Sequence, residues 1–366
     1  MPVRPFVETD IPQATDLYWH HMRRKKTPVP PAMEACFKEL YFTNPWADRS
    51  FPSLVYVDRN GKVVGFVGAF VRNMSFCGKP ISVSLGGNLI VHPEARSGLA
   101  AARLVGAFLS GKQDLQLTDS ANDRARNVEE RMGCYTIPAL NIHWARPLRL
   151  GQYAAYNLSR LAGRAISPWL MLGAKPLSSF ADAMAAKFSA NPFRPVKSRL
   201  QGAELEVETL LQCMIEFRKG YSLWPEYDAA SLGWLLSFLE RRCAHGELRK
   251  VLVRDEDQKA IGWYIYYVVR GGVGEVVQLG GDQKFTKEIL EHLFQDALEQ
   301  GVIAVHGAVD LRHMADFSDK GCLFTCRGGW TLAKSKNEQI LTVLRRGDAL
   351  FSRLDGEWSL DPGILS

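Results

Sequence analysis

The chain of 366 residues is 46% hydrophobic and 23% charged, which is the composition of a soluble globular protein long enough for two domains. Its net charge of +6 comes from Lys and Arg spread along the chain, so we expect no nucleic-acid partner. The seven cysteines lack zinc-ligand spacing, no uncharged apolar run could span a bilayer, and the N-terminus leads straight into charged residues. We therefore expect a cytoplasmic protein without a bound metal.

The first 148 residues predict a mixed sheet with helices on its faces. Asn60-Gly61 stands between two β-rich runs and is a strong hairpin signal, and apolar residues over 99–109 recur at helical spacing. The predicted elements are, in chain order, a strand at 3–7, a helix from residue 9 or 10, strands at 54–57, 63–71 and 82–91, a helix at 99–109, a strand at 115–118, a helix at 123–132 and a strand at 141–144. This order predicts an α/β fold with a mixed sheet.

Residues 149–199 differ in composition from the segments on either side. Aromatic and aliphatic residues alternate with Arg149, Arg160 and Arg164, which predicts an amphipathic helical connector. One interpretation is a helix that packs between two domains. The other is a peripheral contact with the inner membrane, because basic and aromatic residues on an amphipathic helix suit a lipid interface.

The second half repeats part of the first. Lys62–Phe66 and Lys259–Trp263 share the pattern Lys-x-aliphatic-Gly-aromatic, and each follows an acidic turn and continues into a long strand. The elements predicted after the second pattern are a strand at 276–279, a helix at 286–300 and a strand at 303–305. Because the elements follow the same order in both halves, we expect a second, related domain over residues 200–366.

The loop after the strand at 82–91 could bind an anion. The apolar Leu89–Val91 leads through a proline turn into small residues that open a helix. Backbone N–H groups converge on an anion at such a helix N-terminus, where the helix dipole adds positive potential. Gly98, Ala100 and Ala101 are small enough for close backbone approach, and Arg96 supplies a cation.

This stretch resembles the pyrophosphate-binding motif of the GNAT N-acetyltransferase family, in which Val-x-Pro is followed by Arg/Gln-x-x-Gly-x-Gly/Ala. Gly98-Leu99-Ala100 fits the end of the motif, whereas Arg96 stands one residue too close to the glycine. A second family motif, Asn-x-x-Ala-x-x-Leu-Tyr-x-x-x-Gly-Phe, is matched in its spacing by Asn122, Ala125, Val128, Glu129, Gly133 and Cys134.

The resemblance implies an α/β fold of two tandem GNAT-like domains, 1–148 with the CoA site and 200–366 degenerate. In layout the chain is similar to bacterial tandem acyltransferases of envelope polysaccharide or lipid pathways. The resemblance also implies direct acyl transfer from acyl-CoA or acetyl-CoA to an amine on a sugar, an amino acid or a long-chain lipid base. The CoA-binding residues that it implies are Leu89, Ile90, Val91, Arg96, Ser97, Gly98, Leu99, Ala100, Ala101, Asn122 and Ala125.

The catalytic candidates are Glu129 and Asn88. Glu129 stands where many family members have an acid Tyr, and it is interpreted as a surface helix residue, a base or a carboxylate that binds the acceptor. The strand at 82–91 has no carboxylate to act as a base, although Asn88 could orient a water. Gly86-Gly87 indicates either a bulge or space for a bulky acyl chain or acceptor. The alternative function is a degenerate scaffold that binds CoA or an acyl ligand without turnover.

Overall fold

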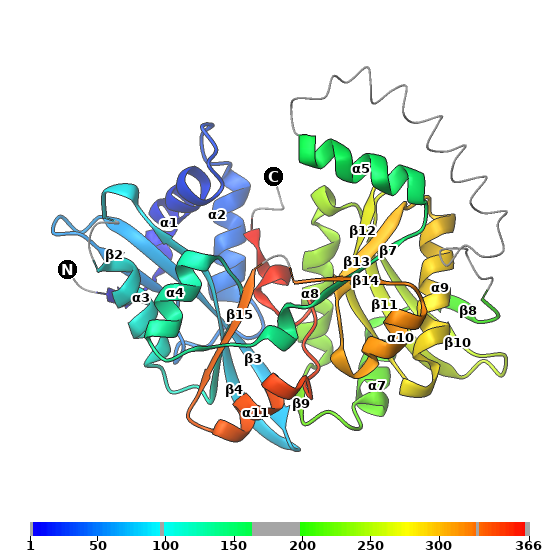
Figure 1. Ribbon diagram of the computed structural model, residues 1–366. Helices are drawn as coiled ribbons and strands as arrows, with labels where there is room; N and C mark the ends of the chain where they lie inside the picture. The colour runs from blue at the N-terminus through cyan, green and yellow to red at the C-terminus, as the bar shows by residue number, and fades with distance from the viewer. Residues whose placement is uncertain (1–2, 96–98, 163–197, 327–328, 363–366) are drawn as a thin grey trace. The chain divides into compact units, whose positions relative to one another are not determined.

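The computed structural model describes residues 3–95, 99–162, 198–326 and 329–362. The chain forms two compact units, each built on one mixed sheet with helices on its faces (Figure 1). The first unit comprises Met1–Asn141, Gly220–Ala244 and Cys326–Ser366, and the second comprises Ile142–Lys219 and His245–Thr325. The predicted α/β fold with two mixed sheets is confirmed.

The first sheet has the strand order β1-β2-β3-β4-β5-β15-β6, with β9 beside β3. Its pairs are antiparallel except for β4 and β5, which are parallel. The predicted hairpin forms between β2 and β3, where Gly61 takes the left-handed conformation with φ of 80°. The strands are β1 Val3–Pro5, β2 Leu54–Val57, β3 Val63–Phe76, β4 Lys79–Val91, β5 Leu115–Ala121, β6 Tyr135–Thr136, β9 Leu223–Pro225 and β15 Trp330–Ser335.

Helices cover both faces of this sheet because its strands are apolar on both sides (Figure 1). Phe66 of β3 packs into the cluster formed with α1 (Ile11–Leu17) and α2 (Pro31–Lys38). The next residue, Val67, packs into the cluster formed with α3 (Ala100–Leu109). The other helical segments of the first unit are the π-helical η2 Tyr18–Met22 and η3 Glu39–Thr43, α4 Asp123–Arg131, α8 Ala229–Glu240, α11 Glu338–Arg346 and the 3-10 helices η1 Glu8–Asp10, η4 Pro93–Ala95, η5 Pro138–Asn141, η7 Cys243–His245 and η10 Glu357–Leu360.

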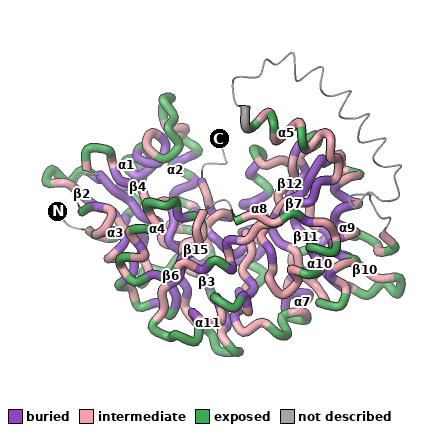
Figure 2. Tube along the Cα trace, in the orientation of Figure 1, coloured by how far each residue is buried: buried purple, intermediate pink, exposed green. Residues whose placement is uncertain are grey.

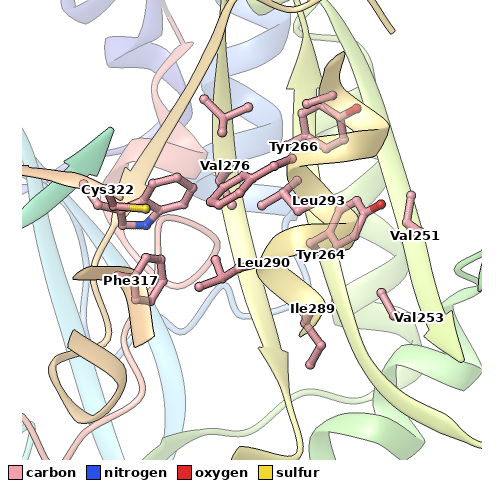
Figure 3. Packing of buried hydrophobic residues seen from close by; sticks show 14 of the residues in the cluster. Val251, Val253, Tyr264, Tyr266, Val276, Ile289, Leu290, Leu293, Phe317 and Cys322 are labelled. Atoms are coloured by element: carbon pink, nitrogen blue, oxygen red, sulfur yellow. The ribbon is translucent and has the colours of Figure 1, made fainter. Parts of the chain in front are cut away.

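The second sheet has the order β14-β7-β13-β12-β11-β10-β8, with a parallel pair between β12 and β13. Figure 3 shows its core, in which Tyr264, Tyr266, Leu290 and Leu293 pack between the strands and α9. Its strands are β7 His143–Pro147, β8 Gln201–Glu204, β10 Glu247–Arg254, β11 Ala260–Val268, β12 Val273–Gly281, β13 Ala304–Ala308 and β14 Leu323–Thr325. Its helical segments are α5 Leu150–Ala162, α7 Val207–Phe217, η8 Gln283–Phe285, α9 Thr286–Glu299, η9 Leu311–His313 and α10 Met314–Asp319.

In each sheet one strand lies between two strands that are far from it in the sequence. β7 was expected to close the first sheet, but it lies between β13 and β14 of the second. β15 lies between β5 and β6 of the first sheet. The units therefore do not coincide with the contiguous boundaries 1–148, 149–199 and 200–366. The physical reason is burial, since Trp144 and Leu332 are each 1% exposed in these positions.

The two sheets nevertheless share one plan. Each begins with antiparallel strands and continues into a parallel pair, which is followed by β15 or β7 and then by a short edge strand, β6 or β14. The repeated patterns Lys62–Phe66 and Lys259–Trp263 lie at the starts of β3 and β11, in corresponding positions of the two sheets. In both sheets Figure 2 shows burial concentrated along the strands.

The amphipathic connector is described only at its beginning. α5 covers Leu150–Ala162, and none of its residues up to Arg160 is buried. Leu158 is 62% exposed. The rest of the predicted connector, residues 163–197, lies outside the described residues.

Candidate active site

The central parallel strands of the first unit pair along only part of their length. β4 and β5 are in register at Val83–Leu115, Ser84–Gln116 and Leu85–Leu117. Beyond these pairs β4 continues beside β3 and β5 continues beside β15, so the two strands part. A hollow lies at this opening, lined by Met22, Val67, Gly86, Gly87, Asn88, Leu89, Val105, Phe108, Thr118, Ser120, Ala121, Asn122, Ala125, Glu129 and Glu357.

A β-bulge distorts β4 where the strands part. Phe66 pairs with Ile90 and Gly68 pairs with Gly87, so β4 contains one residue more than β3 in this interval. Asn88 lies in the bulge with φ of 53°, and its Nδ2 donates a hydrogen bond of 3.0 Å to the Tyr41 hydroxyl. A bulge leaves backbone groups without ladder partners and changes their direction. Asn88 and the next residue, Leu89, both line the hollow.

Gly86 and Gly87 allow side chains of neighbouring elements to approach β4 closely. A Cβ added at Gly86 would lie 2.9 Å from the Phe108 ring, and one added at Gly87 would lie 3.1 Å from Glu357 Oε2. The two glycines therefore admit the side chains of Phe108 and Glu357 on opposite faces of the sheet. The predicted bulge lies directly after them, at Asn88, and both glycines line the hollow.

The second predicted motif lies at the hollow. Asn122 caps α4, and its Oδ1 accepts hydrogen bonds of 3.0 Å from the backbone N–H groups of Arg124 and Ala125. Asn122 and Ala125 both line the hollow.

The first predicted motif is described only in part. Arg96, Ser97 and Gly98 lie outside the described residues. Leu89 lines the hollow, whereas the side chains of Ile90 and Val91 are buried in the packing on either face of the sheet. Leu99 is 66% exposed at the start of α3, Ala100 is 1% exposed in the core, and Ala101 packs against that core.

Glu129 is buried, which makes its interpretation as a surface helix residue wrong. It is 6% exposed, lies on α4 and lines the hollow. The Thr118 side chain forms a hydrogen bond with its carboxyl group, but burial outweighs this contact and raises the pKa of Glu129 to about 7. Close to neutral pH, this carboxyl can hold and release a proton.

Glu357 is the site residue that the sequence analysis missed. It begins η10, which packs against β4 and β5. Its backbone N–H donates to Asp119 Oδ1 at 2.9 Å, and the Ser120 hydroxyl donates to its Oε1. Its Oε2 is buried and has no hydrogen-bond partner within the described ranges. No local pattern marks Glu357, because its partners are more than 200 residues away in the sequence.

Burial also raises the pKa values of Glu357 and its neighbour Asp119. It raises the pKa of Glu357 well above its usual range, and the neighbouring charge of Asp119 adds to the effect. Burial raises the pKa of Asp119 to about 6, against the lowering effects of its hydrogen bond from Glu357 N–H and the charge of Arg353. Two carboxyl groups of raised pKa, Glu129 and Glu357, therefore line one hollow.

The first sheet thus has parallel central strands that part beside a bulge, with helices on both of its faces. No family model matches the sequence, and no curated protein matches it. Among solved structures, the chain is similar to a probable N-acyltransferase from Enterococcus faecalis V583, with a TM-score of 0.61 and 11% identity over 91% of this chain and 72% of that chain. It is also similar to a GCN5-related N-acetyltransferase from Anabaena variabilis ATCC 29413, with a TM-score of 0.58 and 12% identity over 92% of this chain and 73% of that chain.

A third similar structure is the N-myristoyltransferase of Saccharomyces cerevisiae with bound myristoyl-CoA. Its TM-score is 0.53, with 11% identity over 91% of this chain and 77% of that chain. At these identities the likenesses show that the chain shares the fold of these transferases. Within the described ranges, no three His, Cys, Asp or Glu side chains are grouped as metal ligands, and no helix is long and apolar enough to cross a bilayer.

Proposed function

We propose that the chain is an acyl-CoA-dependent N-acyltransferase that moves an acyl group directly from CoA to an amine. The observation that carries this proposal is the parting of β4 and β5 after Leu85 and Leu117, with a hollow at the opening that contains two carboxyl groups of raised pKa. An acyl-CoA arm fits between parting strands because their free edges offer unpaired backbone groups. The acceptor amine then needs groups that accept and supply protons, and carboxyl groups with a raised pKa can do so.

The donor side of the site comprises the β4 bulge and the helices α3 and α4. Backbone N–H groups near Asn88 stabilise the negative charge that develops on the thioester oxygen during attack. Asn122 and Ala125 bound the hollow where the pantetheine arm passes. Arg96, Ser97, Gly98 and the first turn of α3 receive the pyrophosphate, as the motif in the sequence suggests.

Glu129 supplies the proton that the departing sulfur takes up. A carboxylate beside a thiolate would be repulsive if it were ionised, but a pKa of about 7 keeps a large fraction of Glu129 protonated at neutral pH. Glu129 thereby takes the role of the Tyr found in many members of the family. A thiol leaves moderately well without assistance, so this proton contributes to the rate without being indispensable.

The acceptor is an amine on a sugar, an amino acid or a long-chain lipid base. The exposed apolar Leu158 and the exposed Arg160 on α5 support a peripheral contact with the inner membrane from a cytoplasmic protein. A lipid base or a carrier-linked sugar would be reached most easily from that position.

We propose that the second unit does not bind CoA. The residue before its η8 and α9 helices is Asp282, whose carboxylate accepts a hydrogen bond of 3.0 Å from Lys284 N–H. This carboxylate already occupies the position that a phosphate would take, and its charge repels phosphate. One CoA site per chain is therefore expected.

The test combines turnover with binding. CoA release is measured with acetyl-CoA and myristoyl-CoA as donors, and with glucosamine, L-lysine and sphinganine in phosphatidylglycerol vesicles as acceptors. Calorimetry with acetyl-CoA is expected to give one equivalent per chain, and Gly98→Glu is expected to abolish that binding. Binding without CoA release from any pair would favour the degenerate scaffold. An unchanged affinity in Gly98→Glu would move the donor site elsewhere.

A further inference from the structure

The general base that N-acyl transfer requires is absent from β4, and the C-terminal segment brings a carboxylate to the same place. β4 from Lys79 to Val91 contains no Asp or Glu. Glu357 Oε2 lies 3.1 Å from the position where a Cβ on Gly87 would stand, next to the bulge at Asn88. A carbonyl held at that bulge would place an attacking amine beside this oxygen.

The two carboxyl groups lie on opposite faces of the sheet. Successive residues of a strand point to opposite faces, and Gly86 faces Phe108 of α3 whereas Gly87 faces Glu357. Glu129 lies on α4, which packs with α3. Glu129 therefore belongs to the donor side of the opening and Glu357 to the other side, from which an acceptor would approach. This arrangement divides the acid and base roles between them.

The segment around Glu357 is anchored at both ends. Before it, Asp355 accepts a hydrogen bond of 2.7 Å from the Tyr227 hydroxyl. After it, Asp361 accepts one of 2.5 Å from the Tyr18 hydroxyl. Between them Gly356 passes so close to Asp119 that a Cβ would lie 1.8 Å from the Asp119 carboxylate. The segment is thus shaped to hold the Glu357 carboxyl against β4 and β5.

We propose that Glu357 is the general base of the reaction, an inference that rests on the proposed N-acyl transfer. Its carboxylate takes one proton from the acceptor ammonium, and the neutral amine attacks the thioester carbonyl. The new C–N bond forms and the C–S bond breaks. The nitrogen loses its second proton to solvent as the adduct collapses, the sulfur gains one from Glu129, and Glu129 recovers its proton from solvent. The net products are the amide, CoA thiol and one proton, which Glu357 passes to solvent.

The groups around Glu357 determine how readily its carboxylate takes up a proton. The Ser120 hydroxyl stabilises the carboxylate form, whereas the nearby acids favour the protonated form and keep the group basic. An incoming ammonium relieves the repulsion among these acids, which favours a cationic acceptor. The titratable groups that act on Glu357 are Asp119 from β5, Glu129 from α4, Asp361 from its own segment and Tyr41 from η3.

The experiment compares Glu357→Gln, Ser120→Ala and the control Glu338→Gln, which changes an exposed ion pair of α11. CoA release is followed across pH with the best donor and amine of the panel above. We expect Glu357→Gln to lower kcat about 100-fold at neutral pH, with acetyl-CoA affinity within about twofold of the wild type. Its defect should shrink as the pH approaches ~10.4, where about half of a lysine-type amine is deprotonated. Glu338→Gln should match the wild type.

Ser120→Ala serves as a second, milder variant. Loss of the hydroxyl donor should raise the pKa of the Glu357 carboxyl and move the rising limb of the pH profile to higher pH. Wild-type kcat and profile in Glu357→Gln would overturn the inference and leave N-acyl transfer standing. If Glu357→Gln fails to fold, an unshifted limb in Ser120→Ala would overturn it instead. A wild-type chain that transfers to no amine would overturn both proposals.

Discussion

At the residue scale, environment decides what each carboxyl group can do. Glu129 and Glu130 are neighbours on α4, yet their pKa values are shifted in opposite directions. Burial raises the pKa of Glu129 to about 7, whereas hydrogen bonds from Thr136 and Arg126 lower the pKa of Glu130. Only Glu129 lines the hollow. The same residue type therefore gives a proton donor at one position and, at the next, a carboxyl group whose charged form is favoured.

Glu129→Gln tests the acid role. Since the active form is protonated, the rate of the wild type should fall as the pH rises above about 7. The variant should lose this falling limb and have a kcat lower by roughly 10- to 100-fold, because a thiolate leaves partly unaided. The measurement is kcat against pH, with Glu130→Gln as the matched control. A falling limb that persists in Glu129→Gln would assign the titration to another group.

The same substitution has a consequence for stability. Because the pKa of Glu129 is raised in the folded state, the folded chain holds its proton more tightly than the unfolded chain does. This group therefore lowers the free energy of unfolding as the pH rises from its usual value of about 4.3 to about 7. Thermal unfolding of Glu129→Gln should lack that part of the pH dependence.

At the element scale, the cap of α4 connects local structure with the site. Asn122 accepts from two backbone N–H groups that α4 itself cannot satisfy. Asn337 does the same for α11, accepting at 3.0 Å from Gln339 N–H, but it does not line the hollow. Both caps are asparagine side chains that accept from backbone N–H groups, two for Asn122 and one for Asn337, and only Asn122 lies at the hollow.

Asn122→Ala and Asn337→Ala form a matched pair. Each loses a cap and should reduce the free energy of unfolding by about 1 kcal/mol. Only Asn122→Ala should also weaken acetyl-CoA binding, because the first turn of α4 bounds the proposed donor site. Chemical denaturation and calorimetry measure the two effects. Equal loss of acetyl-CoA affinity in both variants would indicate a general effect of stability and not a contact at the site.

At the scale of the whole molecule, each unit depends on a strand from elsewhere in the chain. β15 pairs with both β5 and β6, and its Leu332 and Ala333 are each 1% exposed. Without β15, β5 would present an unpaired edge and the core beneath it would open. β7 has the corresponding place in the second sheet.

A fragment of residues 1–148 tests this dependence. It contains the whole domain that the sequence pattern indicates but lacks β15, α8 and η10. We expect it to aggregate or to unfold without a cooperative transition, whereas the full chain unfolds cooperatively. Circular dichroism during heating and size-exclusion chromatography would distinguish these outcomes. A monomeric fragment with a sharp transition would mean that β15 is dispensable for the fold.

The sequence by itself determined the local elements, because their signals come from neighbouring residues. Asn60-Gly61 predicts its turn, Asn122 predicts the start of α4, and apolar spacing predicts α3. Tertiary structure alone decided the exchange of β7 and β15, the burial of Glu129 and the approach of Glu357 to Ser120. Strand pairing, desolvation and pKa depend on which distant segments meet, and no window of neighbouring residues carries that information.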